Sequence, residues 1–488
     1  MRPTRLIHLV PLAAAIAVSA AAQTPSLALT ACDVPGYPAD ARCGTLRVPE
    51  DRARPDGRQL SLHVVVLPAQ SASPAREAVT FFGGGPGQAI TQSVGFAQRT
   101  FGALRESRDL LFVDQRGTGR SSPLVCRFRD RTDPQSYLDH FIPPDGAARC
   151  RDELSRTADL TRYGYPELAH DVDAVRAALG YERLDLWGAS YGTRAALVYL
   201  RMYPDRVRSV VLQGLAPAEY LQPAGYARDT DAALDGLFAY CRADRACAAA
   251  FPDVAAQARA VADRLESRPA SAEIQDVQSG GPVRLTLTRG TYAETIRRML
   301  YAPFQASRVP WVIHRAHAGD YAPLLREALA DRRASEQNAW GLFMALTCSE
   351  DVPFIDAAAT ARDNGRTLLG DYRYRQQAEA CRGWPTYMPP ANYHLPVPSN
   401  VPALLLSGEL DPVTPPRWGE MAAEALPNSV HLVVPGGGHG FFGMPGAECV
   451  DSLVVRFLAQ GSTQGLDTRC IQRIRRPPFF IEGRTTTP

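Results

Sequence analysis

Short apolar segments alternate with helical patterns along the first 215 residues, and this alternation restricts the fold more than any other feature. The apolar segments are rich in β-branched and aromatic side chains, which favour strands. They occupy residues 60–68, 78–82, 109–114, 184–188 and 208–213. Helices are expected from Pro166 to Gly180 and over 191–202. Nearly continuous apolar strands separated by helices predict a mostly parallel sheet with helices on both faces.

The pattern changes between residues 216 and 396, where helical segments replace the apolar runs of buried strands. These predicted helices cover 231–242, 252–267, 290–300 and 321–346. Strand patterns return at 402–407 and 430–434, followed by a helix at 447–459. The sequence therefore predicts one α/β core interrupted by a largely helical insertion. We expect the core at 23–215 and 397–475, the insertion at 216–396, and a Pro/Thr-rich tail at 476–488.

The first 22 residues have the pattern of a cleaved secretory signal. Arginines precede an apolar run from Leu6 to Ala22, which ends in three small residues. A membrane anchor is one alternative, but the run is shorter than the ~20 residues that span a bilayer. Lipid attachment at Cys32 is another, because the preceding Leu-Thr-Ala resembles a lipoprotein cleavage box. We expect a secreted or periplasmic protein with no membrane span after signal cleavage.

Ten cysteines indicate disulfides in an oxidising compartment. Their spacing favours pairing between neighbours, although a sequence cannot fix connectivity. These neighbour pairs are Cys32 with Cys43, Cys126 with Cys150, Cys241 with Cys247, Cys348 with Cys381, and Cys449 with Cys470. The chain has no C-x-x-C and no H-E-x-x-H motif, which argues against a zinc site.

Charge composition excludes several classes of function. All 53 basic residues are arginines, so chemistry that needs a lysine is excluded, including P-loop phosphate binding and Schiff-base catalysis. The formal net charge is only +2, and no run reaches five like charges. These features argue against nucleic acid or an anionic membrane surface as the main ligand.

The sequence Gly188-Ala189-Ser190-Tyr191-Gly192 lies between a predicted strand and a predicted helix. In that context G-x-S-x-G is the pattern of a nucleophile elbow, in which the glycines permit a sharp turn that exposes the serine hydroxyl. The N-terminus of the following helix favours negative charge that develops beside the serine.

A nucleophilic serine needs a base, and the base needs an orienting acid. In the α/β-hydrolase chain order the acid follows the serine and the histidine comes last. Asp411 directly follows the strand at 402–407, and His439 follows the strand at 430–434 behind three glycines. Both are therefore expected at the carboxyl edge of the sheet, where the elbow opens. Glu409 is the nearest alternative to Asp411.

Two loops precede the elbow. The glycine run at 83–87 follows a predicted strand, and it can direct backbone N–H groups at an oxyanion, together with the N–H of Tyr191. The string D-Q-R-G-T-G-R-S at 114–121 follows the next strand. We interpret it mainly as structural, with Asp114 and Arg116 pairing to hold the neighbouring glycine loop.

Five motifs in this order resemble the prolyl and tripeptidyl aminopeptidases of the α/β-hydrolase fold. They are G-G-G-P-G at 83–87, D-Q-R-G-T-G-R-S at 114–121, G-A-S-Y-G at 188–192, S-G-E-L-D-P-V-T-P at 407–415 and G-G-G-H-G at 436–440. The resemblance covers roughly residues 40–470. Gly83 is a departure, because proline iminopeptidases carry His there, and this weakens any expectation of strict proline specificity.

The resemblance implies Ser190, Asp411 and His439 as the catalytic triad, with the N–H groups of Gly85 and Tyr191 as the oxyanion hole. It also implies a helical cap over the site and a serine exopeptidase that releases short units from peptides with a free N-terminus. No metal or organic cofactor is implied.

An aminopeptidase must recognise a charged α-amine, so an acidic group is expected to face the pocket. We expect Glu350 in this role, with Asp351 as its substitute, because Cys348 could anchor the stretch that carries them. Nearby aromatic residues are interpreted as core rather than pocket lining; these are Trp340, Phe343, Trp384, Phe441 and Phe442.

Two other functions remain open. A carboxylesterase or lipase could use the same triad, because fold and triad do not separate ester from amide substrates. A catalytically silent hydrolase fold that serves as an envelope binding protein is the second, although the complete set of triad residues argues against it. The sequence gives no indication of the oligomeric state.

Overall fold

The computed structural model describes residues 27–483, so the predicted signal at 1–22 lies outside the described residues. Nine strands form one sheet in the order β1-β2-β3-β5-β4-β6-β7-β10-β11. Their bounds are β1 Thr30–Ala31, β2 Arg42–Pro49, β3 Gln59–Leu67, β4 Glu77–Phe82, β5 Asp109–Val113, β6 Arg183–Ala189, β7 Val207–Gln213, β10 Ala403–Gly408 and β11 Ser429–Val434. The strands predicted from apolar runs are confirmed to within two residues, whereas β1 and β2 were not predicted.

The six strands from β5 to β11 are parallel, and β1, β2 and β3 join them as antiparallel strands at one edge. Every residue of β10 is buried, as expected for a strand covered on both faces. This topology is the α/β-hydrolase fold, and the predicted fold class is confirmed.

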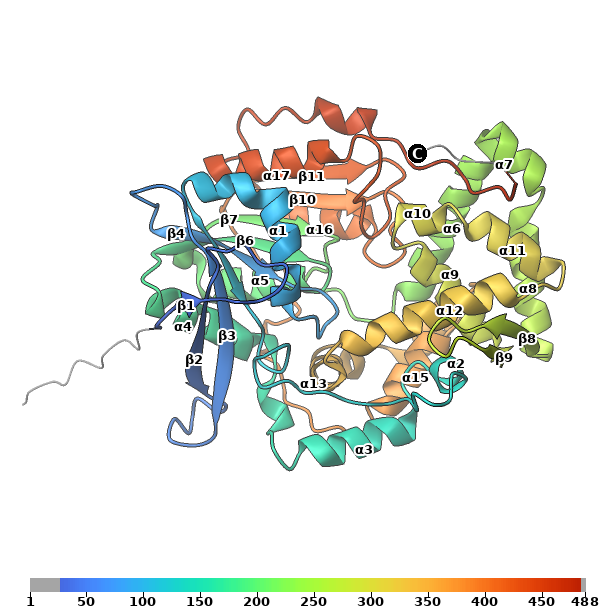
Figure 1. Cartoon of the computed structure of the whole chain (residues 1–488), viewed down its shortest axis with the longest axis horizontal. Helices are drawn as coiled ribbons and strands as arrows, with labels where there is room; N and C mark the ends of the chain where they lie inside the picture. Colours follow the sequence, from blue (N-terminus) through green and yellow to red (C-terminus); the bar gives the residue numbers. More distant parts are fainter. Residues whose placement is uncertain (1–26, 484–488) are drawn as a thin grey trace, which may run out of the picture.

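Helices cover both faces of the sheet (Figure 1). On one face the core includes α4 (Tyr165–Ala178), α5 (Gly192–Met202) and α16 (Pro416–Ala425). On the other it includes α1 (Val94–Phe101) and α17 (Glu448–Gln460). None of the helices within residues 27–483 is long and apolar enough to cross a membrane.

Between β7 and β10 the chain leaves the sheet and forms a mainly helical body with its own apolar core (Figure 1). Its helices are α6 Tyr226–Ala243, α7 Arg245–Ala250, α8 Val254–Ser267, α9 Arg289–Met299, α10 Pro303–Ala306, α11 Val309–His317, α12 Ala322–Ala334, α13 Trp340–Glu350, α14 Ala357–Asn364 and α15 Tyr372–Ala380. A hairpin, β8 (Ala270–Gln275) and β9 (Pro282–Leu287), was not predicted, because only three of its twelve residues are buried and it lacks the apolar run of a buried strand. The domain boundaries remain a prediction.

Helix α13 differs from the rest of the insertion. All of its residues are buried, and they pack in the same apolar cluster as α4 and α5, not in the separate cluster of the helical body. The predicted helix at 321–346 is therefore two helices, separated by a turn at Ser335–Gln337. Two short helices from the first half of the chain also contact the insertion, α2 (Ser136–Asp139) against α12 and α3 (Pro144–Leu154) against α15.

The ten cysteines form five disulfides, and these are the neighbour pairs that the spacing favours. Cys32 is bonded to Cys43, so its sulfur is not free to carry a lipid. The pair Cys348–Cys381 ties the C-terminal end of α13 to the residue that follows α15. It therefore links the buried helix of the insertion to an outer one.

Two disulfides of the insertion differ mainly in the loop that they close, which spans 33 residues for Cys348–Cys381 and six for Cys241–Cys247. In the chain-entropy account the longer loop stabilises more, by about 1.5 kcal/mol. We predict that the double variant Cys348→Ala/Cys381→Ala lowers the Tm more than Cys241→Ala/Cys247→Ala. Calorimetric melting of both variants tests this, and equal losses would contradict it.

Candidate active site

Ser190 lies in the sharp turn between β6 and α5. Its backbone is left-handed, with φ of +55°, which is strained for a residue with a side chain. The Ser190 N–H donates to the Gln213 carbonyl at 2.8 Å and fixes the turn to β7. A Cβ at Gly192 would lie 2.2 Å from the Phe82 carbonyl oxygen, so only glycine lets the helix start this close to β4.

His439 and Asp411 meet beyond the ends of β10 and β11. His439 Nδ1 lies 2.8 Å from Asp411 Oδ2. Asp411 is buried and accepts hydrogen bonds from the N–H groups of Val413 and Thr414 and from Thr414 Oγ1, at 2.7–2.9 Å. Burial opposes its charge, but His439 and Thr414 outweigh burial and hold the pKa of Asp411 below its ordinary value. An ionised Asp411 can therefore orient the imidazole.

Glu409 does not contact His439. It accepts hydrogen bonds from Tyr240 Oη and from the Gly436 N–H, both at 2.7 Å. Of the two acids that the sequence offers, the structure thus brings Asp411 to the histidine.

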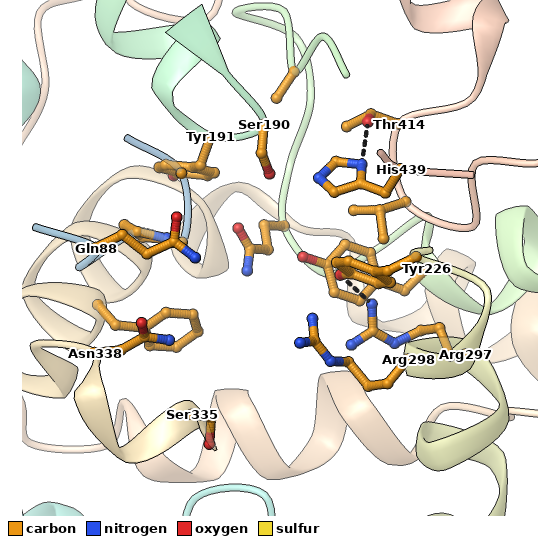
Figure 2. A pocket seen from close by; sticks show the side chains of 18 of the residues that line it. Gln88, Ser190, Tyr191, Tyr226, Arg297, Arg298, Ser335, Asn338, Thr414 and His439 are labelled. Atoms are coloured by element: carbon orange, nitrogen blue, oxygen red, sulfur yellow. Dashed lines mark hydrogen bonds between the residues drawn. The ribbon is translucent and has the colours of Figure 1, made fainter. Parts of the chain in front are cut away.

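Ser190 and His439 line one cavity of about 330 Å³ between the sheet edge and the insertion. Figure 2 shows both side chains on the same side of this cavity. No hydrogen bond joins Ser190 Oγ to His439 in the described structure. Catalytic hydrogen bonds often shorten only in the complex with substrate. Because both side chains line this cavity, a substrate bound there would contact the serine and the imidazole together.

The glycine loop borders the same cavity, to which Gly84, Gly85 and Tyr191 all contribute. Gly84, which the sequence did not single out, lies against the nucleophile, because a Cβ there would be 3.0 Å from Ser190 Cβ. Only glycine at this position lets the loop backbone approach the serine so closely.

The predicted pairing of Asp114 with Arg116 is wrong. Arg116 donates to both carboxylate oxygens of Asp171 at 2.6 and 2.7 Å. Asp114 instead accepts from the N–H and hydroxyl of Thr91 and from the Arg120 N–H. Arg116 thus pairs with Asp171, whereas Asp114 binds Thr91 and so holds the segment that follows the glycine loop.

The expectation that Glu350 or Asp351 faces the pocket is also wrong. Both are fully buried and absent from the cavity wall. Glu350 accepts hydrogen bonds from the Tyr165 N–H and from the hydroxyls of Tyr387 and Tyr393. The physical reason is that only the first turn of α13 reaches the cavity, whereas its C-terminal end, next to both carboxylates, packs in the core with α4 and α5.

Asp351 instead supports the nucleophile turn from behind. It accepts the Tyr191 hydroxyl and, at 2.7 Å, a hydrogen bond from Arg194 Nη1. Tyr191 follows Ser190 directly, and Arg194 lies in the first turn of α5. A buried carboxylate from α13 therefore fixes the helix that carries the serine.

The wall opposite Ser190 consists of charged residues that sequence reasoning missed. They are Glu294, Arg297 and Arg298 from α9, Asp331 and Arg332 from α12, and Arg373 from α15. The Arg-Arg pairs at 297–298 and 332–333 were a visible signal, but nothing in their spacing showed which member faces the site. Of the aromatic residues considered, Trp340, Phe343 and Phe442 line the cavity, whereas Trp384 and Phe441 do not.

Comparisons with known proteins agree with this geometry. Residues 366–470 match the family described as TAP-like protein. The chain is 28% identical over 475 residues to serine protease Hip1 of Mycobacterium tuberculosis, covering 89% of this chain and 88% of the relative. It is 25% identical over 471 residues to the tripeptidyl aminopeptidase of Streptomyces coelicolor, covering 89% and 83%. The resemblance to prolyl and tripeptidyl aminopeptidases is confirmed.

Among solved structures, the proline iminopeptidase of Mycobacterium smegmatis aligns with a TM-score of 0.42 at 18% identity, covering 86% of this chain and 98% of that chain. The sequence matches to the two full-length relatives extend over both parts of the sheet and the insertion between them. Together with the fold, they make this chain a serine hydrolase.

Burial raises the pKa of Glu350 to about 7, although three hydrogen bonds favour its ionised form. The unfolded chain releases this proton near pH 4.5 and the folded chain only near 7, so stability falls as pH rises through that window. We predict that the free energy of unfolding of the wild type falls by roughly 2–4 kcal/mol as pH rises through this window, and that Glu350→Gln removes this loss. Melting temperatures at pH 5 and pH 8 measure this loss.

The matched control is Glu153→Gln, an exposed carboxylate on α3. It should follow the wild-type pH dependence. An identical difference between pH 5 and pH 8 in wild type and Glu350→Gln would show that the buried carboxylate is not the titrating group.

Proposed function

We propose that this chain is an exported serine exopeptidase that hydrolyses peptide bonds near the free N-terminus of short peptides. The observation that carries the proposal is that Ser190, on a strained turn, shares one cavity with His439, which is hydrogen-bonded from behind to the buried, ionised Asp411. The similarity to peptidases over 89% of the chain favours amide substrates.

In this proposal His439 takes the proton of Ser190 as the hydroxyl attacks the scissile carbonyl. The N–H groups of Tyr191 and Gly85 stabilise the oxyanion of the tetrahedral intermediate. His439 then protonates the leaving amine, and water attacks the resulting acyl-enzyme with His439 again as base. Asp411 keeps the imidazole in the productive orientation and stabilises its charged form.

Recognition of an α-amine needs a carboxylate on the cavity wall. With Glu350 and Asp351 excluded, Glu294 and Asp331 are the carboxylates that line it. Glu294 is bound by two arginines, whereas Asp331 accepts from Arg298 through Oδ1 only. We therefore propose Asp331 as the carboxylate that binds the α-amine of the substrate. An esterase with the same triad is the alternative, and it would need no such group.

Five disulfides support export to an oxidising compartment, periplasmic or extracellular, with cleavage after residue 22. The expected mass of the exported protein is that of residues 23–488. Mass spectrometry of protein recovered outside the cytoplasm measures it directly, and a retained leader would contradict the cleavage.

The activity is tested with the oxidised protein, residues 23–488, and fluorogenic Pro-, Ala- and Ala-Ala-Pro-amides, each with a free and an acetylated N-terminus. We expect cleavage of the free-amine substrates, loss on acetylation, and no activity in Ser190→Ala. Cleavage of a p-nitrophenyl ester without any amide cleavage would overturn the peptidase and leave the esterase.

The orienting acid is tested by Asp411→Asn. Because the amide cannot hold His439 in the same tautomer, we expect kcat to fall by ~10⁴-fold. Glu409→Gln, two residues away and without contact to His439, is the matched control and should keep wild-type kcat. Equal losses in both variants would contradict the assignment of Asp411.

A further inference from the structure

The cavity wall opposite Ser190 carries an excess of positive charge. Four arginines line it, Arg297, Arg298, Arg332 and Arg373, against two carboxylates, Glu294 and Asp331. This imbalance is unexpected for a site that binds only an α-amine, because cations repel a cationic substrate group. The arginines come from three helices, α9, α12 and α15, so the excess does not belong to a single charged helix face.

Both carboxylates are already engaged. Glu294 accepts Arg297 Nε at 2.9 Å and Arg373 Nη1 at 2.8 Å, and it is fully buried between them. Asp331 accepts Arg298 Nε at 2.9 Å, which leaves the two terminal nitrogens of Arg298 without an acceptor among the described residues. Figure 2 shows the Arg298 guanidinium pointing into the cavity, across from Ser190 and His439.

Arg332 is the most informative of the four. Its side chain is only 5% exposed, yet no hydrogen bond or ion pair joins it to any described residue. Its guanidinium lies 5.1 Å from the ring centre of Phe141, which also lines the cavity. Its guanidinium lines the cavity without a protein acceptor, and an anion that enters the cavity would supply one.

We propose that the cap wall formed by Arg332 and Arg298 is a subsite for a carboxylate of the substrate. A guanidinium offers two parallel N–H groups that match a carboxylate, which gives both affinity and orientation. The proposal rests on the proposed peptidase function and specifies its substrates as short peptides that present a carboxylate to the cap wall. The carboxylate comes either from an acidic side chain or from the C-terminus of a short peptide.

The test compares four peptides, Ala-Ala-Ala-Glu and Ala-Ala-Ala-Gln, each with a free and an amidated C-terminus. For wild type we expect kcat/KM at least tenfold higher for a peptide with a carboxylate than for the uncharged Gln amide. Preference for Glu in the amidated pair identifies a side-chain carboxylate, and preference for the free C-terminus identifies the terminal one. Equal values for all four peptides would overturn the subsite.

Two variants locate the subsite. In Arg332→Gln and in Arg298→Gln the ratio of kcat/KM between charged and uncharged peptide should fall toward one. The ratio is measured within each variant, so a general loss of activity does not imitate the result, and thermal melting reports folding. Arg326→Gln, an exposed arginine on the same helix, is the control and should keep the wild-type ratio. An unchanged ratio in both test variants would also overturn the proposal.

A second readout does not depend on peptide hydrolysis. The peptides compete with a fluorophosphonate probe for Ser190, and the concentration that halves the labelling rate measures their binding. We expect the acidic peptides to protect at concentrations at least tenfold lower than the uncharged one, with the difference reduced at high salt. Protection without cleavage would refute the peptidase function but support the carboxylate subsite. Cleavage without charge preference would support the peptidase function but refute the subsite.

Discussion

The left-handed turn at Ser190 is the constraint on which the rest of the site depends. It places a strained backbone between β6 and α5, and contacts with neighbouring segments hold it in this conformation. Gly192 touches the Phe82 backbone, the Ser190 N–H is bonded to β7, and Asp351 holds Arg194 and Tyr191 one turn further on. The exposed hydroxyl is thus a consequence of packing over several distant segments.

Helix α13 connects the two halves of this arrangement. It lies within the inserted segment, but its apolar surface packs with the helices of the sheet, and Asp351 at its C-terminal end holds the helix that follows the nucleophile. Most of the remaining helices of the insertion form a separate apolar core, and α9, α12 and α15 present charge to the cavity. Within one insertion, therefore, one helix stabilises the segment that carries Ser190, and other helices supply the charged residues that line the cavity.

The sheet and the reacting residues could be predicted because both have local signals. Apolar runs such as 403–408 indicate buried strands, and Ser190, Asp411 and His439 each follow such a run. Glu350 could not be placed in the same way. Its neighbours are apolar on all sides of α13, so the sequence shows a buried helix without showing which surface buries it. The hairpin β8–β9 was not predicted because few of its residues are buried and it has no continuous apolar run.

The sequence by itself determined the buried strands of a mostly parallel core and the sheet edge that carries Ser190, Asp411 and His439. The physical reason is that parallel strands place their carboxyl ends at one edge, whatever loops join them. Only the tertiary structure decided that Asp411 rather than Glu409 meets His439, that Glu350 is buried, and that Arg298 and Arg332 face the cavity. These outcomes depend on how inserted helices pack across long connections, which no local periodicity encodes.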